Sequence, residues 1–157
     1  MPRVDLPEFP IEGGCVCGAV RYRLSGPPLA AYNCHCTDCQ RASGGNYTVS
    51  LPTPAERAEV ISGELEAFDK PADSGRTVRM QRCAKCGTNV INVPLAAPST
   101  VIVKAGTLDD PSWLRPIGNI WTDSRHPAVL IDETLVNFPG QPPDRQALYD
   151  AWEAALA

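Results

Sequence analysis

The sequence predicts a mainly β protein that ends in a single helix. Sixteen prolines and twelve glycines are spread along 157 residues, which favours many short segments joined by turns over a helical bundle. Several runs alternate apolar and polar residues, as half-buried strands do. The length suits one domain, residues 1–157, and the chain has no evident internal repeat or second domain.

The strands are expected as short runs between turn residues. Residues 1–12 read as a lead-in, and the alternation of Val20, Tyr22 and Leu24 predicts the first strand. Stretches 41–45 and 69–75 are expected to be loops. Further strands are expected at 47–51, where Pro52 would end the strand, within 58–68 on both sides of a Ser62–Gly63 turn, and at 76–82, 89–93, 100–105 and 119–122.

The predicted helix spans about residues 144–156. Asp144 can accept hydrogen bonds from the free N–H groups at its start. The apolar residues recur at helical spacing, so that one face is expected to pack on one side of the sheet. These residues are Ala147, Leu148, Ala151, Trp152, Ala155 and Leu156.

The charge and hydropathy patterns argue against two classes of partner. A net charge of −4 and scattered Lys and Arg residues do not suit a nucleic-acid phosphate backbone. No stretch approaches the roughly 18 apolar residues of a membrane span, and the first residues contain no apolar signal region. We therefore expect a cytoplasmic protein, whose cysteines stay reduced and are more suited to metal binding than to disulfides.

Seven cysteines form three groups along the chain. The two outer groups are pairs, each followed by a glycine that permits the tight turn of a zinc knuckle. Together they supply the four thiolates of a tetrahedral structural zinc site, and we expect that site to link distant parts of the chain. Its ligands would be Cys15, Cys17, Cys83 and Cys86.

The central group, Cys34, Cys36 and Cys39, supplies three sulfurs. Zinc with three protein ligands and one open position is typical of functional sites. Two alternatives stay open at this stage. The three thiols could be buried and inert. Cys36 and Cys39 could instead join the pair at 83–86 in a ribbon-type site, although the intervening segment far exceeds the usual loop of roughly 15–20 residues.

The two histidines are weaker candidates for metal ligands. His35 lies between two cysteines, and in extended backbone its side chain would point away from theirs. We therefore expect His35 to have a supporting or packing role. His126 precedes Pro127 and is expected to lie in a loop.

Four motifs occur in a fixed order: Gly-Gly-Cys-x-Cys-Gly-x-x-Arg-Tyr at 13–22, Cys-His-Cys-x-x-Cys at 34–39, Cys-x-x-Cys-Gly at 83–87 and Gly-Thr-Leu-Asp-Asp-Pro at 106–111. Together they resemble the glutathione-dependent formaldehyde-activating enzyme family, whose domain also occurs in centromere protein V. The resemblance extends from about Gly13 to about Trp121.

The resemblance implies small coiled or tent-like antiparallel sheets around zinc, similar to methionine sulfoxide reductase B. It implies that the outer cysteine pairs bind a structural zinc and that Cys34, Cys36 and Cys39 bind a functional second zinc. It also implies a carbon–sulfur lyase activity that joins glutathione and formaldehyde in S-hydroxymethylglutathione. A thiol held at the open position would be a thiolate near pH 7.

The chain departs from the family pattern at two places. Asn119 occupies a position where many members have histidine, and the loop after the central cysteines is a variant. These differences concern the identity of the substrate more than zinc binding. Arg41, Ser43 and Asn46 are candidates for substrate contacts because they follow the triad on a glycine-rich stretch.

Two other functions fit parts of the sequence. One is a non-catalytic glutathione- or zinc-binding carrier or interaction module. The other is a structural or nucleic-acid module, as centromere protein V suggests, but the pI of about 5.1 argues against it.

Overall fold

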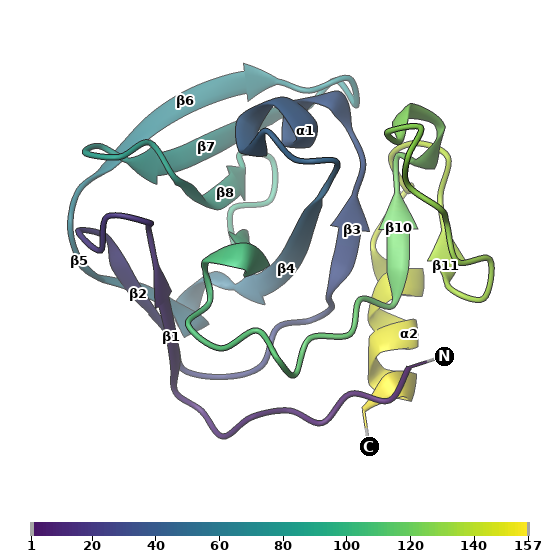
Figure 1. The fold of residues 1–157 in the computed structure, drawn as a ribbon, viewed down its shortest axis with the longest axis horizontal. Helices are drawn as coiled ribbons and strands as arrows, with labels where there is room; N and C mark the ends of the chain where they lie inside the picture. Colours follow the sequence, from purple (N-terminus) through teal and green to yellow (C-terminus); the bar gives the residue numbers. More distant parts are fainter. Residues whose placement is uncertain (1, 157) are drawn as a thin grey trace.

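The computed structural model describes residues 2–156, and this part of the chain contains eleven strands and two α-helices (Figure 1). The prediction of a mainly β fold with a C-terminal helix is therefore confirmed. The helices are α1 (Thr37–Ser43) and α2 (Gln146–Ala155). The strands are β1 (Ile11–Gly14), β2 (Arg21–Leu24), β3 (Tyr32–Cys34), β4 (Thr48–Pro54), β5 (Ala58–Ser62), β6 (Leu65–Pro71), β7 (Thr77–Cys83), β8 (Asn89–Pro94), β9 (Thr100–Lys104), β10 (Gly118–Ile120) and β11 (Val136–Asn137). None of the helices in this described part is long and apolar enough to cross a membrane.

The strands form two sheets. The smaller sheet has the order β1-β2-β5, and the larger has the order β11-β10-β3-β4-β9-β8-β7-β6. Most neighbours are antiparallel, as expected, but β10 runs parallel to both β3 and β11. In Figure 1, β6 and β7 arch over α1 at one end of the larger sheet, and β10, β11 and α2 lie together at the other end.

The alternation of apolar residues with arginines predicts the buried face of β2 correctly. In β2, Tyr22 and Leu24 are fully buried while Arg23 is exposed. The predicted strands on both sides of the Ser62–Gly63 turn are also present, as β5 and β6. However, they belong to different sheets, because β5 pairs with β2 and β6 pairs with β7.

The prediction that Pro52 ends its strand is wrong, since β4 continues through it to Pro54. The Pro52 carbonyl accepts a hydrogen bond from the Leu29 N–H at 2.7 Å, on the edge away from β9. In extended backbone the N–H and C=O of one residue point to the same side. The missing N–H of Pro52 would therefore have pointed away from β9. Its absence does not disturb the pairing of Pro52 with Ile102 of β9.

Smaller expectations also need correction, among them the loop at 69–75, whose first three residues belong to β6. The last two residues of the lead-in begin β1, whose pairing with β2 was not visible in its non-alternating sequence. Residues 41–43 are the end of α1 and not a loop. The strand expected at 119–122 stops at Ile120, because Trp121 adopts a left-handed conformation with φ 60° and a short 3-10 turn, Thr122–Ser124, follows.

Two of the sequence motifs meet where the small sheet contacts the segment after β9. Arg21 donates a hydrogen bond to Asp109 at 2.9 Å, and the hydroxyls of Tyr22 and Thr107 are 2.8 Å apart. Gly13 pairs with Leu108 in an isolated antiparallel bridge. The motifs at 13–22 and 106–111 are therefore two halves of one contact.

Helix α2 covers the end of the larger sheet formed by β10 and β11 (Figure 1). As predicted, Asp144 accepts a hydrogen bond from a free N–H at the start, that of Gln146, at 2.8 Å. A Cβ on Gly118 of β10 would lie 2.6 Å from Leu148, so the helix packs directly on the strand. Its buried face consists of Leu148, Ala151, Trp152 and Ala155, and Leu156 lies just beyond its end.

We predict that Trp152→Ala lowers the free energy of unfolding by about 3–5 kcal/mol, because it leaves a large cavity under α2. Trp152 is fully buried. Chemical unfolding followed by circular dichroism would measure the change, with exposed Glu153→Ala on the same helix as the control. An equally small loss for both variants would contradict the packing described here.

Candidate functional site

The outer cysteine pairs lie on two hairpin turns that belong to different sheets. Cys15 and Cys17 follow β1, while Cys83 ends β7 and Cys86 lies in the turn to β8. All four sulfurs lie within 4.8 Å of one another. Cys17 Sγ is 3.5 Å from Cys15 Sγ and 3.8 Å from Cys83 Sγ. Two sulfurs that are each about 2.3 Å from a tetrahedral zinc are about 3.8 Å apart, so this group has the dimensions of a zinc site.

Backbone geometry aims these sulfurs inward. Gly18 and Gly87 have φ values of 80° and 81°, which are strained for residues with a Cβ. The Val20 N–H donates to Cys15 Sγ at 3.1 Å, and the Lys85 N–H donates to Cys83 Sγ at 3.3 Å. Such N–H groups stabilise negative charge on sulfur, which favours the thiolate form that binds metals.

The central cysteines come together at the junction of β3 and α1. Cys34 ends β3, Cys36 is the N-cap of α1, and Cys39 lies in its first turn. The three sulfurs lie within 4.8 Å of one another, separate from the group formed by the outer pairs. The structure thus does not bring Cys36 and Cys39 together with the 83–86 pair, which was the alternative that the sequence left open. These two cysteine groups could each hold a metal ion.

Helix α1 begins at the triad because Cys36 acts as its cap. The Cys36 sulfur accepts a hydrogen bond from the Cys39 N–H at 3.3 Å, the position usually filled by a serine or aspartate oxygen. Gly44 ends the helix with φ 68°. The helix was missed in the sequence because cysteine is not a usual cap residue and the segment has only seven residues.

Lys104 is the buried cation beside the triad. The residue is 7% exposed, and its Nζ lies 3.8 Å from Cys39 Sγ and 3.4 Å from Thr48 Oγ1. Within residues 2–156, no carboxylate oxygen lies within 4.0 Å of this nitrogen. Hydrogen bonds from the Cys34 and Cys36 thiols lower the pKa of Cys39, and the charge of Lys104 adds to that effect. A buried ammonium needs an anion nearby, and a Cys39 thiolate meets this need.

His35 and Asn119 support the site without joining either cysteine group. His35 is fully buried, and its Nε2 is 2.9 Å from Asn119 Oδ1. The backbone carbonyl of His35 accepts hydrogen bonds from Gln40 and Ser124. Asn119 also donates to Asn137 at 2.8 Å and so connects β10 to β11. This places His35 in the supporting position that was expected from strand alternation.

His126 lies on the surface, in the loop after the 3-10 turn, as expected. Its Nδ1 accepts a hydrogen bond from the Ala128 N–H at 3.2 Å, and the side chain is exposed. It belongs to neither cysteine group.

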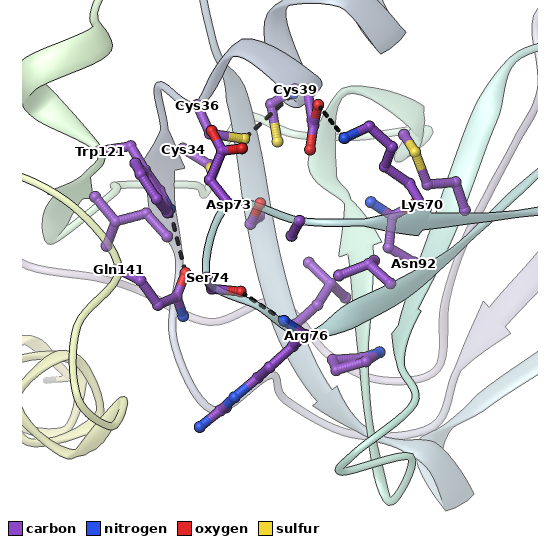
Figure 2. Close-up of a pocket in the computed structure, with 18 of the residues that line it drawn as sticks. Cys34, Cys36, Cys39, Lys70, Asp73, Ser74, Arg76, Asn92, Trp121 and Gln141 are labelled. Carbon is purple, nitrogen blue, oxygen red and sulfur yellow. Dashed lines mark hydrogen bonds and ion pairs between the residues drawn. The ribbon is translucent and has the colours of Figure 1, made fainter.

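A pocket opens directly on the triad (Figure 2). Cys34, Cys36 and Cys39 line one end, and the loop between β6 and β7 forms one wall. Figure 2 shows the Asp73 side chain on this loop pointing toward Cys36. The opposite wall comes from the segments after β10 and before α2. Residues of these two walls that the sequence did not reveal are Lys70, Asp73, Ser74, Arg76, Trp121, Gln141 and Arg145.

The three predicted substrate contacts lie outside this pocket. Arg41 lines a neighbouring depression, which shares Asp38 and Lys70 with the pocket. Ser43 faces its own helix, where its hydroxyl donates to the Cys39 carbonyl at 2.8 Å, and Asn46 is exposed beyond the end of α1. The chain after the triad continues along helix α1, so these side chains lie away from the three sulfurs.

The fold and the two cysteine groups define a mainly β protein with two sites able to hold metal. A profile of the family described as glutathione-dependent formaldehyde-activating enzyme matches residues 10–124. Since this is well over half of the chain, the protein belongs to that family, as the four motifs predicted.

Two individual proteins are similar to this chain, one in sequence and one in fold. A curated Halomonas elongata protein, provisionally named as a glutathione-dependent formaldehyde-activating enzyme, is 33% identical over 82 residues. The match covers 50% of this chain and 52% of the relative, so the chain spans about half the length of the relative. A crystal structure of a Rhodobacter sphaeroides protein has the same fold, with a TM-score of 0.52 and 20% identity over 68% of this chain and 92% of that one.

We predict that Gly87→Ala lowers the free energy of unfolding by about 1–2 kcal/mol, since a left-handed conformation is unfavourable for alanine. No atom would obstruct the new Cβ, so the loss would measure backbone strain alone. Gly106→Ala is the matched control, because its Cβ also meets nothing and its φ is not left-handed. Urea unfolding of both variants would test this, and equal stabilities would contradict it.

Proposed function

We propose that this protein joins glutathione to formaldehyde, or cleaves the resulting adduct, as a zinc-dependent carbon–sulfur lyase. The observation that carries the proposal is that three cysteine sulfurs converge at the end of an open pocket. Family membership supports the choice of thiol and aldehyde. We infer that the reaction takes place in the cytoplasm, where thiols stay reduced, and that residues 1–157 act as one domain.

In this proposal Cys15, Cys17, Cys83 and Cys86 hold a structural zinc. The sulfur separations match a tetrahedral ion, as described above, and the set contains only thiolate donors, which zinc accepts. The site would connect the β1–β2 turn to the β7–β8 turn. Its binding free energy would therefore contribute directly to folding.

Cys34, Cys36 and Cys39 would hold the second zinc, with one position facing the pocket. The ion would hold the external thiol as a thiolate near pH 7, although a free thiol has a pKa of about 8.5. Lys104 offsets part of the negative charge of the sulfur cluster. This makes the approach of another anionic sulfur less unfavourable.

The chemical step forms one bond between the thiol sulfur and the formaldehyde carbon, while the carbonyl oxygen gains the proton that the thiol loses. Asp73 is the pocket carboxylate on the Cys36 side (Figure 2), so we assign it the transfer of that proton. Met80, Ile102 and Ile120 add apolar side chains to the lining of the pocket. Arg41, Ser43 and Asn46 stay predictions for contacts with parts of a ligand that extend beyond the pocket.

We predict two zinc ions per chain in protein purified under reducing conditions. Cys36→Ser should leave one zinc in a folded protein, because it affects the triad alone. Cys83→Ser should abolish the folded state, because it removes the link between two sheets. Elemental analysis and circular dichroism would measure both effects, and a single zinc in the unmodified protein would contradict the assignment.

We also predict that the zinc-loaded protein accelerates formation of S-hydroxymethylglutathione, followed by NMR at neutral pH. In Cys36→Ser the rate should return to the uncatalysed value, while Glu153→Gln on the exposed face of α2 should behave like the original protein. If the protein binds glutathione but leaves the rate uncatalysed, it is a carrier and the proposed activity is wrong.

A further inference from the structure

The wall of the pocket opposite the β6–β7 loop includes chain that lies outside the family match. The matched region ends at residue 124, whereas Gln141 and Arg145 line the pocket from the segment before α2. Trp121 Nε1 donates to Gln141 Oε1 at 3.1 Å, which holds this segment against the end of β10 (Figure 2). This chain thus completes its pocket with residues that the family pattern does not specify.

Arg145 is held on the same side of β3 as the triad. Its Nε donates to the buried Tyr32 hydroxyl at 3.2 Å. Tyr32 and Cys34 are two residues apart on β3 and both buried, so their side chains share one face, with Cα atoms about 7 Å apart. The guanidinium and the triad therefore face the same pocket, within the reach of a peptide-sized thiol.

The charge of Arg145 has no anionic partner in the described residues 2–156. No carboxylate oxygen lies within 4.0 Å of its guanidinium, or of that of Arg76. The neighbouring Asp144 side chain is directed to the Gln146 N–H at the start of α2. A half-buried guanidinium without a counter-charge is well suited to receive one from a ligand.

Arg76 lies at the same end of the pocket. It lines both the triad pocket and an adjoining depression, and Gln141 and Arg145 also line both. The acidic side chains of the triad pocket lie elsewhere: Asp38 pairs with Lys70 at 3.4 Å, and Asp73 points toward Cys36 (Figure 2). The triad end of the pocket therefore holds the sulfurs and both carboxylates together with the cations Lys70 and Lys104. At the other end, the two guanidinium groups have no carboxylate within 4.0 Å in residues 2–156.

We propose that Arg145 and Arg76 form an anion-binding subsite that takes a carboxylate of the substrate while its sulfur lies at the triad. The inference rests on the proposed function of the same site and names the residues that recognise the carboxylate end of its thiol substrate. A guanidinium binds a carboxylate through two parallel hydrogen bonds, so a neutral ester or amide at this position is bound less tightly.

The test uses the zinc-loaded full chain and two probes whose sulfur is blocked, S-methylglutathione and its diethyl ester. Because neither probe can present a thiolate, calorimetry measures recognition of the rest of the molecule. The unmodified protein should bind the acid at least about tenfold more tightly than the diester, the ratio expected for a charge-assisted hydrogen bond. Arg145→Gln and Arg76→Gln should each reduce that ratio severalfold.

Two control variants separate recognition from structural support. Arg125→Gln removes the same charge from an exposed residue whose side chain donates to the Thr122 carbonyl, and it should keep the ratio. Tyr32→Phe removes the support of Arg145 but keeps its charge, so it should reduce the ratio less than Arg145→Gln. If Arg145→Gln fails to fold, the binding ratio of Arg76→Gln tests the subsite instead, because Arg76 is exposed.

An unchanged ratio in folded Arg145→Gln and Arg76→Gln overturns the subsite, and so does an equal loss in Tyr32→Phe and Arg145→Gln. The adduct-formation assay distinguishes failure of the proposed function from failure of the subsite. A protein that does not accelerate the reaction, but prefers the acid in an Arg145-dependent way, has the subsite without the activity. A protein that accelerates the reaction and binds acid and diester equally has the activity without the subsite.

Discussion

The convergence of four cysteine sulfurs from two hairpins is the constraint on which the rest of the structure depends. One hairpin belongs to the three-stranded sheet and the other to the eight-stranded sheet, so this group joins the two sheets. The Val16 N–H adds a hydrogen bond to Thr88 Oγ1 across the same junction, at 3.2 Å. Four thiolates in one place repel one another unless a cation neutralises them, so a metal bound here would be coupled to the relative position of the two sheets.

The second cysteine group depends on a different kind of support. A strand end and a helix cap bring its sulfurs together, and the buried His35–Asn119 pair holds the connection between them. Asn119, one of the two places where the chain departs from the expected family pattern, lies behind the site and does not line the pocket. A different residue at position 119 would therefore first change the hydrogen bonds that support the cysteine group, and only through them its contacts with a ligand. The side chains that meet a ligand come from the β6–β7 loop and the segment before α2.

Much of the fold could be predicted because local pattern and tertiary environment agree. Tyr22 and Leu24 alternate with polar residues and are buried, and the apolar stripe of α2 faces the sheet. The failures occur where a long-range contact overrides the local signal. Pro52 is tolerated inside β4 because its missing donor lies on an edge that needs none, and α1 forms because a cysteine replaces the usual cap.

The sequence by itself determined the family, the mainly β class and the residues able to bind metal, since spacing within a short segment limits which sulfurs can meet at one point. Only the tertiary structure decided that Cys36 and Cys39 lie apart from the 83–86 pair. It also decided which side chains surround the triad, because Asp73, Trp121 and Arg145 come from three distant segments. Contacts between such segments depend on strand order and on how α2 packs, which no local pattern of residues records.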